Sequence, residues 1–420
     1  MDWILLTFAI GYLAIIFENK TKINKTAPAL LMAIITWLLL YQSLPVDLID
    51  AELGDKINEI CQIIFFLFGA MTIVELIDAH KGFRILTDLV YTSSKKKLLW
   101  ILGITTFVLS SILDNLTTTI VMVSLVRKLV PETKSRLILG AMIVIAANAG
   151  GAWSPIGDVT TTMLWIQGNI STFGVMRSLF FPSLTALVVA LFLLGIPLKG
   201  NYAHAVEKAH EKTPEPGGTL LFFSGIALLI SVPLFKTLTG LPPFMGIFLS
   251  LGILWVLTDL LHGEEESRRH LRVPHILTRI DTSGILFFLG ILLCIGALDI
   301  AGLLKQLALF LDSTLKDTTL IAAIIGLISA VIDNVPLVAA GMRMYDLSIY
   351  PPDSSFWHLL AYCAGTGGSA LIIGSAAGVA FMSLEKVDFF WYLRKAGWIA
   401  FLSYASGIFV YWLQESIYPL

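Results

Sequence analysis

The chain has 420 residues, of which 56% are hydrophobic and only 14% charged, with a net charge of −2. Charged residues make up about a quarter of an ordinary soluble domain, so the composition excludes that class and gives no sign of a nucleic-acid partner. Apolar stretches long enough to cross a bilayer follow one another without strand-like alternation, which predicts a polytopic helical membrane protein. The three cysteines have neither metal-ligand spacing nor the pattern of a disulfide framework.

The placement of lysine and arginine predicts the orientation of the first spans, because basic loops stay on the cytoplasmic side. Residues 3–17 form the first span, which we expect to be retained, and the basic segment 19–25 follows it inside. Residues 28–41 then cross outward, the acidic segment 46–59 forms an outer loop, and residues 60–77 return. The N-terminus is therefore expected on the outer side.

Residues 98–130 are predicted to form a re-entrant hairpin. Their apolar part is too long for one span and too short for two, and basic residues stand at both ends. Asp114 and Asn115 lie in the middle, at the expected tip of the hairpin. Non-helical backbone at that depth is tolerated only inside protein or beside water, so the tip should face a polar site.

Residues 137–167 are predicted to form a helix broken in the middle of the membrane. The break falls at 148–157, where two adjacent glycines and Pro155 interrupt the helical hydrogen bonds. Residues 178–198 then cross back, and the polar segment 199–218, with two prolines, forms a central cytoplasmic linker.

The second half of the chain repeats this pattern. Its features are spans at 219–235, 244–261 and 282–298, a hairpin at 318–345 with Asp333 and Asn334 in its middle, a broken helix at 356–384 and a last span at 396–412. Loop charges predict the opposite orientation for this half and place the C-terminus outside. We therefore expect an all-α polytopic membrane protein with two inverted-topology repeats, residues 1–198 and 219–420, each with five crossings, one re-entrant hairpin and one broken helix.

The hairpin tips and the broken helices should bring oxygen-bearing side chains together near the midplane. The residues expected there are Asp114, Asn115, Thr117, Asn148, Ser154, Asp158, Thr160, Thr161, Ser329, Asp333, Asn334, Thr366, Ser369 and Ser375. None of them is a cysteine, a histidine or a basic residue. Carboxylate and amide oxygens suit a hard cation, whereas an anion would call for basic groups or helix N-termini. The pattern favours a small cation, and carboxylates that hold either that cation or a proton would be sufficient for exchange.

Each of these residues also has a purely structural alternative. The three aspartates could simply cap the helices that follow them, the threonines could bond back to their own helix, and the glycines could serve close helix packing. Glu75 could be an interfacial acid. The histidines of the predicted cytoplasmic loops, namely His80, His204, His210, His262, His270 and His275, are expected to be solvated, with pH sensing as the alternative.

Four segments, 69–80, 113–119, 147–161 and 333–336, together resemble the NhaD-type Na⁺/H⁺ antiporters of the ion transporter superfamily. The resemblance implies a homodimeric secondary transporter that exchanges Na⁺ or Li⁺ for H⁺ by alternating access and needs no cofactor. It fits a bacterial inner membrane, and related proteins also occur in chloroplast envelopes. It implies roles in transport for Glu75, Asp114, Asn115, Asn148, Asp158, Thr160, Thr161, Ser329, Asp333, Asn334 and Ser369. Among these, Asp114, Asn115, Asp158 and Asp333 are the expected Na⁺ ligands.

Two other functions remain open at this point. One is an anion carrier of the same superfamily, for a dicarboxylate or arsenite, against which the absence of a basic residue in the core argues. The other is a cation channel, in which the same acids would line a continuous pore. A membrane enzyme is not expected, because the chain has no visible nucleophile–base pair or metal cluster.

Overall fold

The computed structural model describes residues 2–86, 92–202, 215–263 and 265–417. This part of the chain is helical, and eight of its helices are long and apolar enough to cross a membrane. The chain is therefore a multi-pass membrane protein, as its composition predicts. Most of the predicted central linker, together with His204 and His210, lies outside the described residues.

The helices of the first half follow the predicted order. They are α1 (Asp2–Ile16), α2 (Glu18–Thr21), α3 (Thr26–Ser43), α4 (Val46–Ala79), α6 (Lys95–Ser110), α7 (Asn115–Leu129), α8 (Thr133–Ala152), α9 (Val159–Ile166) and α10 (Thr172–Gly195). The pair α6 and α7 corresponds to the predicted hairpin, and the pair α8 and α9 to the predicted broken helix.

The second half has a matching series of helices. They are α11 (Gly218–Thr239), α12 (Pro243–His262), α13 (Val273–Ile276), α14 (Thr282–Ile300), α15 (Leu303–Leu315), α16 (Thr318–Ile328), α17 (Asn334–Met344), α18 (Ser355–Gly367), α19 (Ala376–Glu385), α20 (Phe389–Tyr392) and α21 (Trp398–Ile417). Here α16 and α17 form the hairpin, and α18 and α19 form the broken helix.

The predicted outer loop at 46–59 is helical. The acidic segment 46–59 continues α4 as one helix of 34 residues, with Ile49 buried along it. The segment after α14 forms α15, in which Leu304 and Ala308 are buried while Lys305 is exposed. The prediction of a loop at 46–59 was wrong. Polar residues spaced along one face still permit a helix when the opposite face packs against protein.

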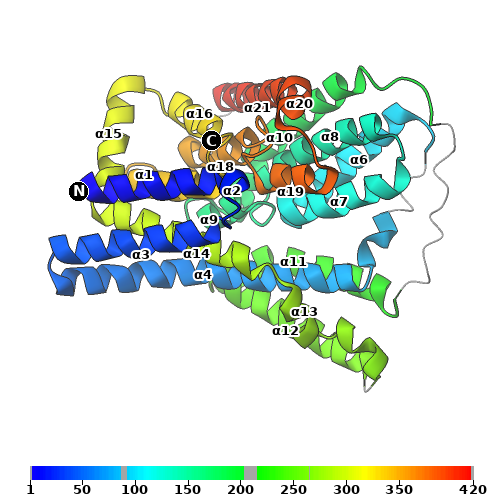
Figure 1. The fold of residues 1–420 in the computed structure, drawn as a ribbon, viewed down its shortest axis with the longest axis horizontal. Helices are drawn as coiled ribbons and strands as arrows, with labels where there is room; N and C mark the ends of the chain where they lie inside the picture. The colour runs from blue at the N-terminus through cyan, green and yellow to red at the C-terminus, as the bar shows by residue number, and fades with distance from the viewer. Residues whose placement is uncertain (1, 87–91, 203–214, 264, 418–420) are drawn as a thin grey trace.

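The helices lie in two layers (Figure 1). The first layer contains α1, α3, α4, α11, α12 and α14, which pack on one another. The second layer contains the hairpins, the broken helices, α10 and α21, and its closest packing joins α10 to α21, α6 to α8 and α16 to α18. The turns of both hairpins and the breaks of α8–α9 and α18–α19 therefore belong to the same layer.

Two of the histidines expected to be solvated are buried instead. His80 directly follows α4 and His262 ends α12, and their Nε2 atoms lie 2.8 Å apart. The Nδ1 atom of His80 lies 2.8 Å from the backbone oxygen of Leu76, so it carries the proton. His80 Nε2 is then the acceptor and His262 Nε2 the donor. The prediction failed because it took charge-rich loop sequence as a sign of solvent exposure, whereas these rings pack where two first-layer helices end.

Candidate cation site

Each of the three aspartates caps the helix that follows it. Asp114 Oδ1 accepts a hydrogen bond from the backbone N–H of Thr117, at 2.8 Å, at the start of α7. Asp158 Oδ1 accepts the N–H of Thr160, at 2.9 Å, at the start of α9, and Asp333 caps α17. The capping alternative therefore describes all three residues correctly. Capping occupies only part of a carboxylate, because its two oxygens offer about four acceptor positions.

The same three carboxylates line one cavity of about 140 Å³. Its other polar lining residues include Asn115, Thr117 and Asn334, and its apolar wall includes Phe66 and Phe287. Asp158 and Asn115 are almost fully buried, while the side chain of Asp333 keeps 21% of its surface. The two hairpin turns and the first broken helix thus deliver acids and amides to one place, as the sequence predicts.

A buried hydrogen-bond chain joins the two halves of the protein beside this cavity. The amide nitrogen of Asn115 donates to Asp158 at 2.6 Å and to Asn148 at 3.0 Å. The amide nitrogen of Asn148 donates to the hydroxyls of Ser369 and Ser375, at 2.8 and 2.9 Å. Because buried polar groups cost free energy unless they are paired, this chain fixes the relative position of the two broken helices. Both bonds of Asn115 are made by its amide nitrogen, so its side-chain oxygen takes no part in this chain.

Several predicted site residues line neither this cavity nor the larger one described next. They are Ser154, Thr160, Thr161, Ser329, Thr366, Ser369 and Ser375, together with Asn148. Thr366 donates to the oxygen of Tyr362 four residues earlier, and Ser329 donates to the oxygens of Gly326 and Ala364. Of the predicted site residues, the structure brings Asp114, Asn115, Thr117, Asp158, Asp333 and Asn334 to the surface of this cavity.

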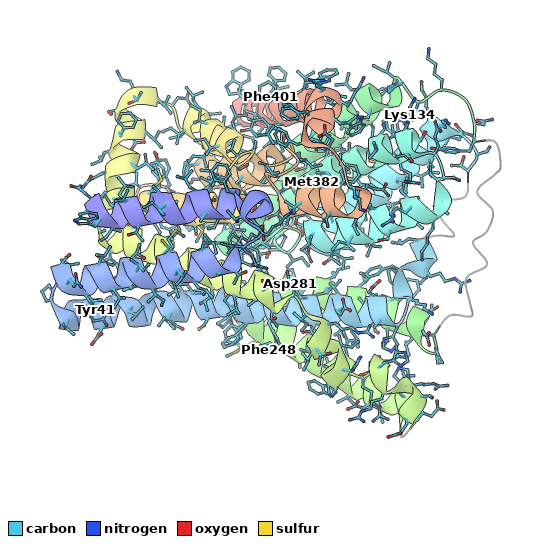
Figure 2. The ribbon with its side chains drawn as sticks, in the orientation of Figure 1. Tyr41, Lys134, Phe248, Asp281, Met382 and Phe401 are labelled. Carbon is cyan, nitrogen blue, oxygen red and sulfur yellow. The ribbon has the colours of Figure 1, made fainter. Side chains whose placement is uncertain are left out.

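A second, larger cavity of about 1250 Å³ leads away from the first. The two share Lys25, Thr117, Asp333 and Asp281, the last of which is labelled at the centre of Figure 2. The larger cavity runs between α4 of the first layer and α7 and α19 of the second, and Glu75 lies on its wall. Lys81, Arg84, Lys128 and Arg279 also line it. They come from segments predicted to be cytoplasmic, so the cavity opens toward that side.

The expectation that no basic residue reaches the site was wrong. Lys25, the residue before α3, places its Nζ atom 3.7 Å from Oδ2 of Asp333, and it lines both cavities. In the sequence it is the last member of a basic segment read as a cytoplasmic loop. No local signal separates it from its neighbours, because only the packing of the two layers brings it to Asp333.

On the opposite side of the cavity, ion pairs join the first-layer helices α4 and α14 to each other and to α17 of the second layer. Lys56 of α4 lies 2.9 Å from Asp299 of α14, and Arg343 of α17 pairs with Glu59 of α4. Arg343 also comes within 4.0 Å of Asp299. These contacts link α17 to both first-layer helices on the predicted outer side, whereas the large cavity separates the layers on the other.

Helices broken beside a buried, acid-lined cavity that opens to one side define the class of secondary transporters. The chain matches the family described as "Citrate transporter" over residues 12–350 and belongs to that family. It is 54% identical to Sodium/proton antiporter 2 of Arabidopsis thaliana, over 99% of this chain and 100% of that protein. Sodium/proton antiporter 1 of the same plant is 55% identical, over 97% of this chain and 71% of that protein. The Na(+)/H(+) antiporter NhaD of Alkalimonas amylolytica is 31% identical, over 98% and 90%. The resemblance to NhaD proteins is thereby confirmed, and the relatives are named as transporters and not as enzymes.

Proposed function

We propose that the protein is a secondary transporter that exchanges Na⁺, or Li⁺, for H⁺. The observation that carries the proposal is the convergence of the Asp114, Asp158 and Asp333 carboxylates on one cavity that reaches one side of the protein. The printed names of the similar plant and bacterial proteins support the same activity. No cofactor is needed, because the two exchanged cations are the only reactants.

In the proposed cycle, the site holds either Na⁺ or protons. Carboxylates packed close together in a dry cavity repel one another, so they take up protons unless a metal ion neutralises them. Asp114, Asp158, Asp333 and the side-chain oxygen of Asn115 are the proposed Na⁺ ligands, and all four residues line the cavity. Asn334 lines it as well and is the proposed fifth contributor, while Asn148 and Thr160 act by holding Asn115 and Asp158 in place.

Alternating access is proposed to move the second layer against the first. The large cavity and the ion pairs opposite it support an inward-facing state, with the loops of the large cavity in the cytoplasm. The similar order of helices in the two halves supports inverted repeats, and the basic loops of the sequence support both termini outside. A homodimer in a bacterial inner membrane completes the proposal. Labelling of single cysteines near each terminus in intact cells tests the orientation, and light scattering of the purified protein tests the dimer.

Asp114→Asn tests the site itself. Asparagine also caps helices, so the variant should fold, yet it removes one of the carboxylates on which exchange depends. We expect Na⁺ addition to everted vesicles to cause no change in internal pH in this variant. The matched control is Asp317→Asn, at another capping aspartate, which bonds Thr319 and Leu320 and lines neither cavity. Unchanged exchange in the Asp114 variant would refute the site.

A specific observation favours one alternative, namely an anion carrier. Lys25 brings a positive charge to the cavity, and the family is described as citrate transporters. The cavity nevertheless has four carboxylates, those of Asp114, Asp158, Asp281 and Asp333, against one ammonium group, a balance that repels an anion. Proteoliposome uptake of citrate, succinate and arsenite, compared with Na⁺-driven proton flux, separates the two functions.

A cation channel is the other alternative. The ion pairs on the predicted outer side disfavour it, because they join the layers there, and voltage-clamp recording of the reconstituted protein tests it.

A further inference from the structure

Lys25 forms the contact between the two layers at the entrance of the acidic cavity. Its backbone N–H donates to a side-chain oxygen of Glu18, and the hydroxyl of the next residue, Thr26, donates to the backbone oxygen of Ser283 in α14. The loop that holds Lys25 is therefore fixed to the first layer. Asp333, its ionic partner, caps α17 in the second layer. The pair thus crosses the boundary along which the proposed motion occurs.

The ammonium group of Lys25 lies where a transported cation would bind. Nζ of Lys25 lies 3.7 Å from Oδ2 of Asp333 and 4.3 Å from the centre of the Phe287 ring, which also lines the cavity. The ring face attracts a cation as the carboxylate does. The side chains of Lys25 and Asp333 keep 33% and 21% of their surface, so the pair is open to ions that enter through the large cavity.

Two cations bound beside Asp333 at the same time would repel each other and raise the free energy of the complex. A carboxylate in a partly dry cavity needs a counter-charge, whereas two like charges a few ångströms apart repel strongly where water is scarce. A metal ion bound at Asp333 must therefore compete with the ammonium group of Lys25. Displacing that group would also release the contact that joins α17 to the loop before α3.

We propose that Lys25 is a built-in counter-ion that occupies the acidic cavity when no Na⁺ is bound and leaves Asp333 when Na⁺ enters. This inference rests on the proposed exchange function and makes Lys25 a positioning residue and not a ligand. The ammonium group lowers the affinity of the site for Na⁺, which favours release of the ion. Because the ammonium group leaves Asp333 when Na⁺ binds, this contact between the layers depends on whether the cavity holds Na⁺.

The test is the Na⁺ affinity of purified protein in detergent, measured by calorimetry with choline chloride holding the ionic strength constant. Lys25→Gln and Lys25→Met should bind Na⁺ about tenfold more tightly, because a competing positive charge is gone. Lys25→Arg should stay close to the wild-type affinity, since it keeps the charge. The matched control is Lys56→Gln, which breaks the other interhelical lysine–aspartate pair, at Asp299, and should leave the affinity unchanged. A loss of stability alone would not tighten binding.

A second measurement uses the wild-type protein and therefore does not depend on whether a variant folds. Na⁺ should increase the reaction of Lys25 with an amine-reactive reagent, detected by mass spectrometry, whereas choline should not. Unchanged or weaker Na⁺ binding in both uncharged variants, or labelling that Na⁺ does not affect, overturns the inference while the exchange function stands. If the wild-type protein binds no Na⁺ at all, the proposed function fails and this inference fails with it.

Discussion

Asp158 shows how one side chain serves both structure and site. Its Oδ1 accepts the backbone N–H and the hydroxyl of Thr160, while its Oδ2 accepts the amide of Asn115. The bonds to Oδ1 cap the start of α9, directly after the break, and the bond to Oδ2 joins the broken helix to the tip of the first hairpin. Capping therefore does not prevent Asp158 from lining the cavity, and the two alternatives that the sequence presents are compatible in one residue.

The buried histidine pair makes stability depend on pH at the residue scale. Burial lowers the pKa of His80, which lies just beyond the end of α4, to about 4, with a smaller opposing effect from its hydrogen bond to Leu76. In the unfolded chain its pKa is about 6.5. Between these values the unfolded state binds a proton that the folded state does not, so stability present above about pH 6.5 is lost as the pH falls toward 4.

We therefore expect the melting temperature of the purified protein to fall more steeply between about pH 7 and 5 than that of His80→Gln. Glutamine cannot take up this proton, so the variant should lose less stability over the same interval. His275→Gln, at an exposed histidine, is the control and should follow the wild-type curve. Equal slopes for all three proteins would contradict the assignment of His80.

At the scale of elements, backbone-to-backbone packing holds each hairpin against a broken helix. A Cβ atom at Gly367 of α18 would lie 2.0 Å from the backbone oxygen of Gly326 in α16. One at Gly157, in the first break, would lie 2.6 Å from the backbone oxygen of Ser110 at the end of α6. The two predicted uses of these glycines, breaking helices and allowing close packing, therefore coexist. Small residues let membrane helices approach each other in this way.

Gly367→Ala should therefore destabilise the protein by about 1–3 kcal/mol, because the added methyl group forces α16 and α18 apart. Gly252→Ala is the matched control. It lies in α12 with nothing within 4 Å of an added Cβ, and alanine favours the helix. Thermal unfolding in detergent measures both variants. A Gly367 variant that melts no earlier than the Gly252 variant would show that the two helices can separate at little cost.

At the scale of the whole molecule, the two layers are joined on one side and separated on the other. The ion pairs of Arg343 with Glu59 and Asp299 connect α17 to α4 and α14. On the opposite side, the cavity of about 1250 Å³ divides α4 from α7 and α19. A molecule that alternates must reverse this asymmetry, which requires the contact between Arg343 and Glu59 to break in each cycle.

Cross-linking tests that requirement. In the Glu59→Cys, Arg343→Cys double variant, with Cys61 replaced by serine because it lies in the same helix, a short thiosulfonate cross-linker should stop Na⁺/H⁺ exchange. Dithiothreitol should restore it. Each single-cysteine variant, treated in the same way, should keep its activity. Full exchange by the cross-linked protein would mean that α4 and α17 do not separate during transport.

The sequence by itself determined the helical membrane class, the helix interruptions just before Asn115, Val159, Asn334 and Ala376, and three of the acids that line the cavity, whereas it missed Asp281. These features follow from local physics, namely span length, glycine and proline in a helix, and aspartate before a helix start. Only the tertiary structure decided that Asn148 bonds Ser369 and Ser375, that Ser329 and Thr366 turn away from the cavities, and that Lys25 reaches Asp333. The contacts of Asn148 and Lys25 join partners hundreds of residues apart, which leave no periodic or capping signal in the chain. The direction in which Ser329 and Thr366 face depends on how the second-layer helices pack.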